Sequence, residues 1–197
     1  SKEMDSEVLD FSQSLSIDIV LYRADIEVTI AHVEMLSSCG HITASEQRKI
    51  INALKKVNKL AESGQLKWSV KHEDVHMNIE NALVKLIGDV GKKIHLGRSR
   101  NDLITTDLRL YLRDFIDIYL DKIREIQFVI AKTALKHADS LFPGFTHMQV
   151  AQPVTFGHHL LAWGEMLYRD ELRLQNNREL MNIMPLGSAA LSGTSLK

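Results

Sequence analysis

Apolar residues recur at spacings of three or four along most of the chain, a pattern that predicts helices. The first two such runs extend from about Ile17 to Ser38 and from about residue 44 to residue 63. Cys39-Gly40 suits the end of the first helix, and Thr43-Ala44-Ser45-Glu46 is a capping-box sequence for the start of the second. Because only a few residues join these helices, we expect them to pack as an antiparallel pair.

Three more helices are predicted, from about Glu73 to Ile87, Asp102 to His137 and Thr155 to Met181. The 102–137 helix would be roughly 50 Å long at 1.5 Å per residue. Its apolar residues occupy more than one face, so we expect other subunits to cover part of it. The segment 88–101 is expected to be a basic, flexible loop. No strand pattern competes with helix, and the predicted fold class is all-α, a bundle of long helices.

Residues 143–154, Pro-Gly-Phe-Thr-His-Met-Gln-Val-Ala-Gln-Pro-Val, form a turn-rich stretch between the two longest predicted helices. Thr146 and Gln149 place polar groups beside His147. An imidazole can transfer protons near neutral pH, so His147 is a candidate acid or base. The alternative is a structural histidine that is hydrogen-bonded to a backbone carbonyl in a tight connection.

Composition gives no support to nucleic-acid-binding, membrane or secreted classes of protein. The chain has 45% hydrophobic and 25% charged residues, as expected of a globular protein, and its net charge of −1 gives no reason to expect a nucleic acid or an anionic membrane as partner. The single Cys39 excludes an internal disulfide and fits a reducing compartment. The polar N-terminal stretch does not have the pattern of a signal peptide, and no apolar run reaches membrane-spanning length. These features predict a cytoplasmic protein.

Two short motifs carry candidate chemistry. His72-Glu73-Asp74-Val75-His76 matches the zinc-protease template, but no later residue is marked as a third zinc ligand, so we expect no metal here. The histidines could instead flank the apolar face of a helix, or Asp74 and His76 could border a polar site. Residues 97–102, Gly-Arg-Ser-Arg-Asn-Asp, place two arginines at the start of the longest helix, where carboxylates or phosphates bind well. The alternative is a solvated basic turn.

Together these stretches resemble the fumarase/aspartase superfamily, and within it the argininosuccinate lyase family with its delta-crystallin relatives. The resemblance covers nearly the whole chain, and four motifs occur in the family's order. They begin with Glu73-Asp74-Val75-His76, Gly97-Arg98-Ser99-Arg100-Asn101-Asp102, Pro143-Gly144-Phe145-Thr146-His147 and Pro185-Leu186-Gly187-Ser188. Leu103, Met148 and Val150 depart from residues that are common in the family, and none of these departures removes a catalytic group.

The resemblance implies a reversible elimination that cleaves argininosuccinate into arginine and fumarate, without a metal or an organic cofactor. His147 matches the family's general acid/base histidine. The resemblance assigns the remaining matched polar residues to substrate binding: Ser14, Asp74, His76, Arg100, Asn101, Thr146 and Gln149. Negative charge develops on a substrate carboxylate during this reaction, and the donors in this group would stabilise it.

The resemblance also implies a homotetramer in which each active site combines regions of three subunits. Family members are more than twice as long, and this chain lacks the mobile loop that carries the second acid/base group, a serine. We therefore expect an N-terminal fragment that folds but has little or no activity alone, with an N-terminal helical domain at 1–100 and the start of the central bundle at 101–197. The alternatives are a sibling fumarate-releasing lyase and a crystallin-like structural protein.

Overall fold

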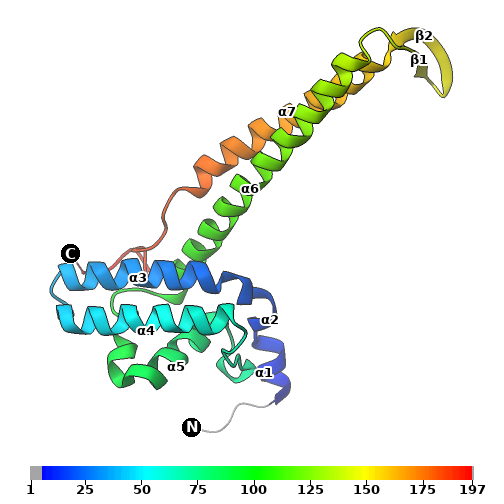
Figure 1. Ribbon diagram of the computed structural model, residues 1–197. Coiled ribbons are helices and arrows are strands. Elements are labelled where there is room, and N and C mark those ends of the chain that lie inside the picture. Colours follow the sequence, from blue (N-terminus) through cyan, green and yellow to red (C-terminus); the bar gives the residue numbers. More distant parts are fainter. Residues whose placement is uncertain (1–5, 197) are drawn as a thin grey trace. The chain divides into compact units, whose positions relative to one another are not determined.

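The computed structural model describes residues 6–196 (Figure 1). Residues 1–5 of the polar N-terminal stretch, and residue 197, lie outside the described part. The chain divides into two compact units. The first unit comprises residues 1–111 and 184–197, and the second comprises residues 112–183. The boundary that we predicted between two domains, at residue 100, stays a prediction.

The first unit consists of short helices, two longer helices and 3₁₀ turns. In chain order they are α1 (Ser6–Ser12), α2 (Leu15–Asp18), η1 (Ile19–Leu21), α3 (Tyr22–Ser38), α4 (Ala44–Glu62), η2 (Val70–His72), α5 (Val75–Ile87), η3 (Gly88–His95) and the first turns of α6 (Arg100–Lys136). The predicted antiparallel pair is α3 and α4, side by side in Figure 1. The capping box is present, since the Thr43 side chain accepts from Glu46 N and the Glu46 carboxylate accepts from Thr43 N.

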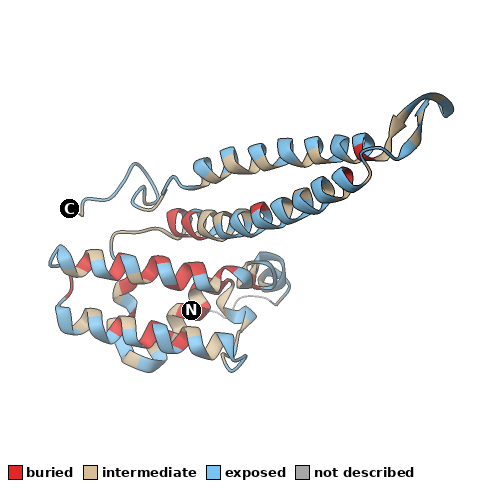
Figure 2. Cartoon of the chain, turned by 45° about the horizontal axis from the view of Figure 1, so that its top comes forward, coloured by how far each residue is buried: buried red, intermediate tan, exposed pale blue. Residues whose placement is uncertain are grey.

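Buried apolar side chains concentrate where α3, α4 and α5 meet, as the red segments of these helices show in Figure 2. The fully buried members include Val33 and Leu36 of α3, Leu54 of α4 and Leu83 of α5. The helical spacing of these residues produces one apolar face on each helix. This core fixes the N-terminus of α5, where several candidate site residues lie.

Two predictions for the first unit are wrong, one for a helix boundary and one for a loop. We expected the third helix to begin at Glu73, but Glu73 has a left-handed φ of 58° and α5 begins at Val75 with Asp74 as its N-cap. The segment that we expected to be a flexible loop instead folds into the 3₁₀ turns of η3, in which Gly91 lies against Leu83 of α5. A side chain at Gly91 would crowd that contact.

The second unit contains the remainder of α6, a two-stranded hairpin and α7 (Phe156–Met181). The predicted bounds of both long helices lie within two residues of the observed ones, and the predicted end at Met181 is the observed one. Ion pairs join α6 and α7: Arg178 Nε lies 2.8 Å from Asp117 Oδ1, and Arg124 Nε lies 2.8 Å from Glu171 Oε1. Close backbone contact joins them too, because Gly157 N donates to His137 O at 3.0 Å, just beyond the end of α6.

The hairpin is the element that the sequence reading missed. Strands β1 (Leu141–Thr146) and β2 (Gln149–Thr155) pair antiparallel, and the register shifts between Pro143 and Phe145. Prolines at opposed positions and non-glycine residues in the turn concealed the strand pattern. Apart from this pair of short strands the regular elements of the described chain are helices, and the all-α fold class is confirmed. Within residues 6–196, no helix is both long and apolar enough to cross a membrane.

Candidate functional site

Asp74 organises the first group of candidate residues. Its side chain is buried, and as the N-cap of α5 it accepts a hydrogen bond from Met77 N at 2.8 Å. Its other oxygen, Oδ2, lies 2.9 Å from Arg100 Nη1, and Glu73 Oε2 lies 3.5 Å from the same nitrogen. A helix N-terminus favours negative charge, so this carboxylate is stabilised both by the helix and by the guanidinium. Asp74 and Arg100, both predicted from the sequence, therefore meet directly.

Ser14 joins the same group through the backbone. Ser14 N donates to Glu73 O at 2.9 Å, and its hydroxyl donates to Asp18 Oδ2 at 2.6 Å. Asp18 Oδ1 in turn accepts from Val75 N at 3.2 Å, so α2 is tied to the start of α5. The sequence reading missed Asp18. Its only local signal is its position four residues after Ser14, one helical turn away.

His76 follows Asp74 by half a turn and is buried between two acidic residues. Its Nδ1 is hydrogen-bonded to Asp25 of α3 and lies 3.5 Å from Asp107 Oδ2 of α6. His72, in contrast, lies in η2 and contacts Asn81. The zinc-protease reading requires both histidines on one face of one helix, and this geometry excludes it.

The two arginines of residues 97–102 have separate environments. Arg98 is largely buried and donates to Thr29 Oγ1 at 3.1 Å, and burial lowers the pKa of its guanidinium. Arg100 is the partner of Asp74. Asn101 is exposed at the first turn of α6. The alternative of a solvated basic turn therefore does not hold for Arg98, whose guanidinium is largely buried.

Asp102 attaches the motif at residues 185–188 to the same helix end. Its Oδ2 accepts from Gly187 N at 3.1 Å and from Ala189 N at 2.7 Å, and its Oδ1 accepts from Ser99 N at 3.0 Å. Three backbone N–H groups therefore converge on this one carboxylate. Two motifs that are far apart in the sequence are thus joined within the first unit.

The remaining candidates lie at the turn of the hairpin in the second unit. Thr146 pairs with Gln149, and His147 and Met148 form the two-residue loop between them. Both loop residues have left-handed φ angles, 50° and 60°, as a type I′ turn requires. Such angles cost free energy in residues other than glycine, and this strain is common at functional sites. The turn presents Thr146, His147 and Gln149 on an exposed surface.

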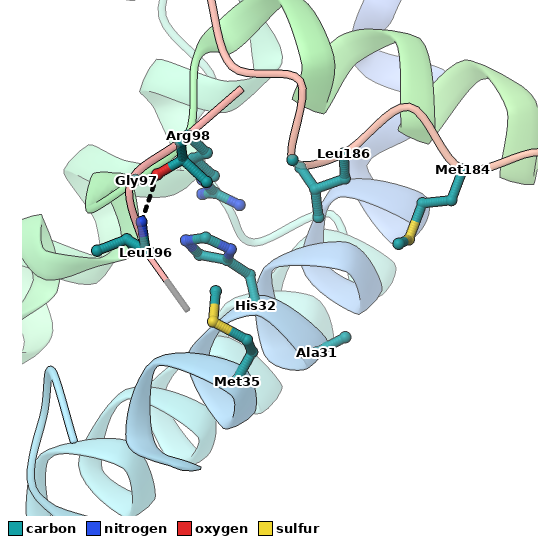
Figure 3. A pocket seen from close by; sticks show the side chains of 10 residues that line it. Ala31, His32, Met35, Gly97, Arg98, Met184, Leu186 and Leu196 are labelled. Carbon is teal, nitrogen blue, oxygen red and sulfur yellow. Dashed lines mark hydrogen bonds between the residues drawn. The ribbon is translucent and has the colours of Figure 1, made fainter. Parts of the chain in front are cut away.

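A pocket of about 320 Å³ lies elsewhere in the first unit. Figure 3 shows His32 and Met35 of α3 facing this space, with Leu186 and Leu196 of the C-terminal segment around it. Burial and the nearby Arg98 lower the pKa of His32, whose Nε2 is hydrogen-bonded to Leu96 O at 2.8 Å. The lining is mostly apolar and includes none of the predicted site residues, so this pocket is separate from the Asp74 group.

The first unit therefore contains Ser14, Asp74, His76, Arg100 and Asn101, and the second contains Thr146, His147 and Gln149. Their roles stay predictions. Chemically, the first group offers paired carboxylates, a hydroxyl and a guanidinium, which suit a substrate with both acidic and cationic ends. The hairpin turn offers an exposed imidazole for proton transfer.

One set of described residues has the spacing of metal ligands. The side-chain atoms of Asp25, His76 and Asp107 lie within 4.8 Å of one another. Arg98 already supplies positive charge beside these carboxyl groups, and His76 Nδ1 is already bonded to Asp25. We therefore interpret the set as a hydrogen-bonded cluster and not as metal ligands.

Comparisons with known proteins identify the family of the chain. The model of the lyase family matches residues 1–197. The chain is 54% identical over 191 residues to an argininosuccinate lyase of Alkalilimnicola ehrlichii, and 50% identical over 195 residues to one of Hydrogenovibrio crunogenus. These matches cover 97% and 99% of this chain but only 41% and 42% of the relatives, so the chain spans about two fifths of their length.

A solved structure of an EDDS lyase variant with bound fumarate has the same fold, with a TM-score of 0.82 and 31% identity. That match covers 95% of this chain and 36% of the other. The resemblance inferred from the four motifs is confirmed by these similarities, which extend over almost the whole sequence. The chain belongs to the lyase family, and within it the chain is similar to argininosuccinate lyases.

Proposed function

We propose that this chain is the N-terminal part of an argininosuccinate lyase, which reversibly converts argininosuccinate into L-arginine and fumarate. The observation that carries the proposal is the 54% identity to such an enzyme over 97% of the chain. The Asp74 group supports it, because argininosuccinate has carboxylates and a guanidinium. Arg100 and Asn101 offer donors to the former, and carboxylates such as Asp74 suit the latter.

In the proposed reaction a base removes a proton beside a substrate carboxylate, and the C–N bond to the guanidinium breaks. Negative charge develops on the carboxylate, where preorganised donors lower the barrier. His147 acts as the acid/base group, with Thr146 and Gln149 positioning substrate beside it. The strained two-residue turn favours this role because it presents the imidazole in a fixed, exposed position. The reaction needs no cofactor.

We propose that the active site forms in a cytoplasmic homotetramer, from regions of different copies. Two observations support this assembly. The candidate residues fall into two separate units, and α6 and α7 expose many apolar side chains in the second unit. Because the family's serine loop is absent from these 197 residues, the chain alone is expected to be inactive or nearly so.

A sibling fumarate-releasing lyase is the second candidate. The similarity to EDDS lyase with bound fumarate favours it, because that enzyme shares the fold at 31% identity. A panel of amino-dicarboxylate substrates distinguishes the two candidates when it is applied to the active mixed oligomers described below, because the chain alone is expected to be inactive. Fumarate release from argininosuccinate alone supports the first, and release only from another member of the panel supports the second.

The test uses mixed oligomers. The chain is combined with the full-length Alkalilimnicola ehrlichii enzyme inactivated at the residue aligned with His147, and fumarate is followed by its ultraviolet absorbance. Activity is expected because this chain supplies the missing imidazole to sites completed by the other subunits. The matched control is the same chain with His147→Asn, which should form the same oligomers without activity. Inactive mixed oligomers, once sizing shows that they have formed, would contradict the proposal.

A further inference from the structure

His76 has a protein partner on only one of its ring nitrogens. Nδ1 is hydrogen-bonded to Asp25, while Nε2 is buried and has no hydrogen-bond partner among the described residues. The whole side chain is only 3% exposed. A buried ring nitrogen without a partner is costly, so a donor that reaches Nε2 from outside the chain would remove that cost.

Asp25 has donors for both of its oxygens. Oδ2 faces His76 Nδ1, and Oδ1 accepts from Thr29 Oγ1 at 3.4 Å. The Thr29 hydroxyl oxygen accepts from Arg98 Nη1 at 3.1 Å, so a chain of hydrogen bonds leads from the guanidinium to the carboxylate. Both Asp25 oxygens thus face hydrogen-bond donors, and a carboxylate oxygen can only accept, so this geometry assigns the shared proton to Nδ1.

Asp107 differs, although it is as deeply buried. Neither of its oxygens has a donor among the described residues, and Nδ1 of His76 is 3.5 Å away. Burial, reinforced by the charge of Asp25, raises the pKa of Asp107 to about 9, against the lowering effect of Arg98. Asp107 is thus protonated at neutral pH.

We propose that Asp25 is a positioning residue that holds His76 in its Nδ1–H form, so that Nε2 presents a lone pair to a cationic N–H donor of the substrate. Such a donor is a guanidinium or ammonium group, which has no acceptor of its own. The substrate part of this inference rests on the proposed function. Asp107 contributes volume and a neutral carboxyl group but does not select the tautomer.

The tautomer is tested first, on the 197-residue chain itself and without any substrate. Long-range ¹H–¹⁵N correlation spectra of the ¹⁵N-histidine-labelled chain report which ring nitrogen carries the proton. The His76 signals are identified by their loss in His76→Gln. We expect a protonated Nδ1 and an unprotonated Nε2 at neutral pH. A proton on Nε2 with an unprotonated Nδ1, or a metal ion bound at Asp25, His76 and Asp107, would overturn the proposal.

A matched pair of substitutions separates positioning from packing. Asp25→Asn and Asp107→Asn make the same change in the same cluster. Asp25→Asn removes the ionised acceptor, so His76 should become a mixture of tautomers, and Asp25→Glu should restore the Nδ1–H form. Asp107→Asn replaces one neutral group by another and should leave the His76 spectrum unchanged. Equal changes in both Asn variants would show that the cluster has only a packing role.

Activity is measured in mixed oligomers with the relative inactivated at the residue aligned with His76, so that this chain must supply that imidazole. Asp25→Asn should lower fumarate release on the order of 10- to 100-fold, the usual effect of losing a residue that orients a functional histidine. Asp107→Asn should stay within about threefold of the unsubstituted chain. If the mixture with the unsubstituted chain releases no fumarate but the spectra show a protonated Nδ1, the proposed function is contradicted and the assignment of Asp25 is supported.

Discussion

Asp107 and Asp117 lie on the same helix, and their surroundings change the pKa of each in opposite directions. Asp107 is fully buried without a donor, and burial raises its pKa to about 9. Asp117 is hydrogen-bonded to Arg178 at an exposed position, and this bond lowers its pKa. The pH dependence of stability should therefore have opposite signs at the two residues.

Asp107→Asn should flatten the pH dependence of the free energy of unfolding. In the native chain Asp107 keeps its proton up to about pH 9, whereas in the unfolded chain it loses it near its ordinary pKa of 3.8. Its contribution to stability is thus fully present below the unfolded pKa and is lost as pH rises, by up to about 1.4 kcal/mol per pH unit. Urea unfolding of both chains from about pH 5 to about pH 8 measures this slope, because this range lies between the unfolded and the folded pKa of Asp107.

Asp117→Asn is the control for the same substitution. Because its folded pKa is lowered, Asp117 contributes stability above its unfolded pKa and loses that contribution as pH falls. This variant should keep the native slope between neutral and alkaline pH. An Asp107→Asn chain whose slope equals that of the native chain would mean that Asp107 is ionised in the folded state.

At this scale short motifs mark individual residues in the sequence but do not mark their partners. Asp74, His76 and Arg100 were identified from short motifs, and Asp74 and Arg100 do meet. Asp25 is 51 residues from His76 and belongs to a helix with no motif of its own. Nothing local marks such a residue, because only packing of distant helices brings it to the imidazole.

At the scale of elements, local signals decided which boundaries could be predicted. The capping box at Thr43 marks its helix start within the sequence itself. The start of α5 was missed because the left-handed Glu73 leaves no pattern in an otherwise helical sequence. The hairpin was missed because a type I′ turn usually contains glycine or asparagine, and here His147 and Met148 occupy it.

Gly144→Ala should destabilise the hairpin. A Cβ at this position would lie 2.6 Å from Gln152 O, a backbone atom of the paired strand that cannot move without disturbing the bulge. We expect a loss of about 1–3 kcal/mol in the free energy of unfolding, as for other overpacked sites. Urea unfolding measures the loss, and hydrogen exchange of the β1 and β2 amides locates it.

Gly164→Ala is the matched control, because the same atom added there meets only Ile130 Cγ2 at 3.6 Å, an ordinary contact. Gly164 lies inside α7, where alanine is the better helix former by about 1 kcal/mol. This variant should be as stable as the native chain or more so. If both variants behave alike, the close approach of Gln152 to Gly144 does not constrain the hairpin.

For the molecule as a whole, the two units differ in how much core each contains. Most of the buried apolar residues belong to the first unit, whereas the described part of the second unit buries few, among them Leu120 and Ala134. Figure 2 shows α6 and α7 mostly in the colours of exposed and intermediate residues. The sequence predicted this excess of apolar surface from the several apolar faces of α6, but no single chain can show what covers it.

We expect the second unit to associate with other copies through α6. Phe128, Val129 and Leu135 are 70%, 60% and 80% exposed, and Phe128 and Leu135, seven residues apart, share a face of α6; exposed apolar side chains that gather on one face mark an interface. Phe128→Glu places a charge on this surface and should shift the chain toward the mass of a single copy in sedimentation velocity. Asn177→Glu adds the same charge at an exposed polar position of α7 and should leave assembly unchanged. A native chain that sediments as one copy at every concentration would contradict the shared-site assembly. His147 could not then contribute to an active site that it shares with another subunit.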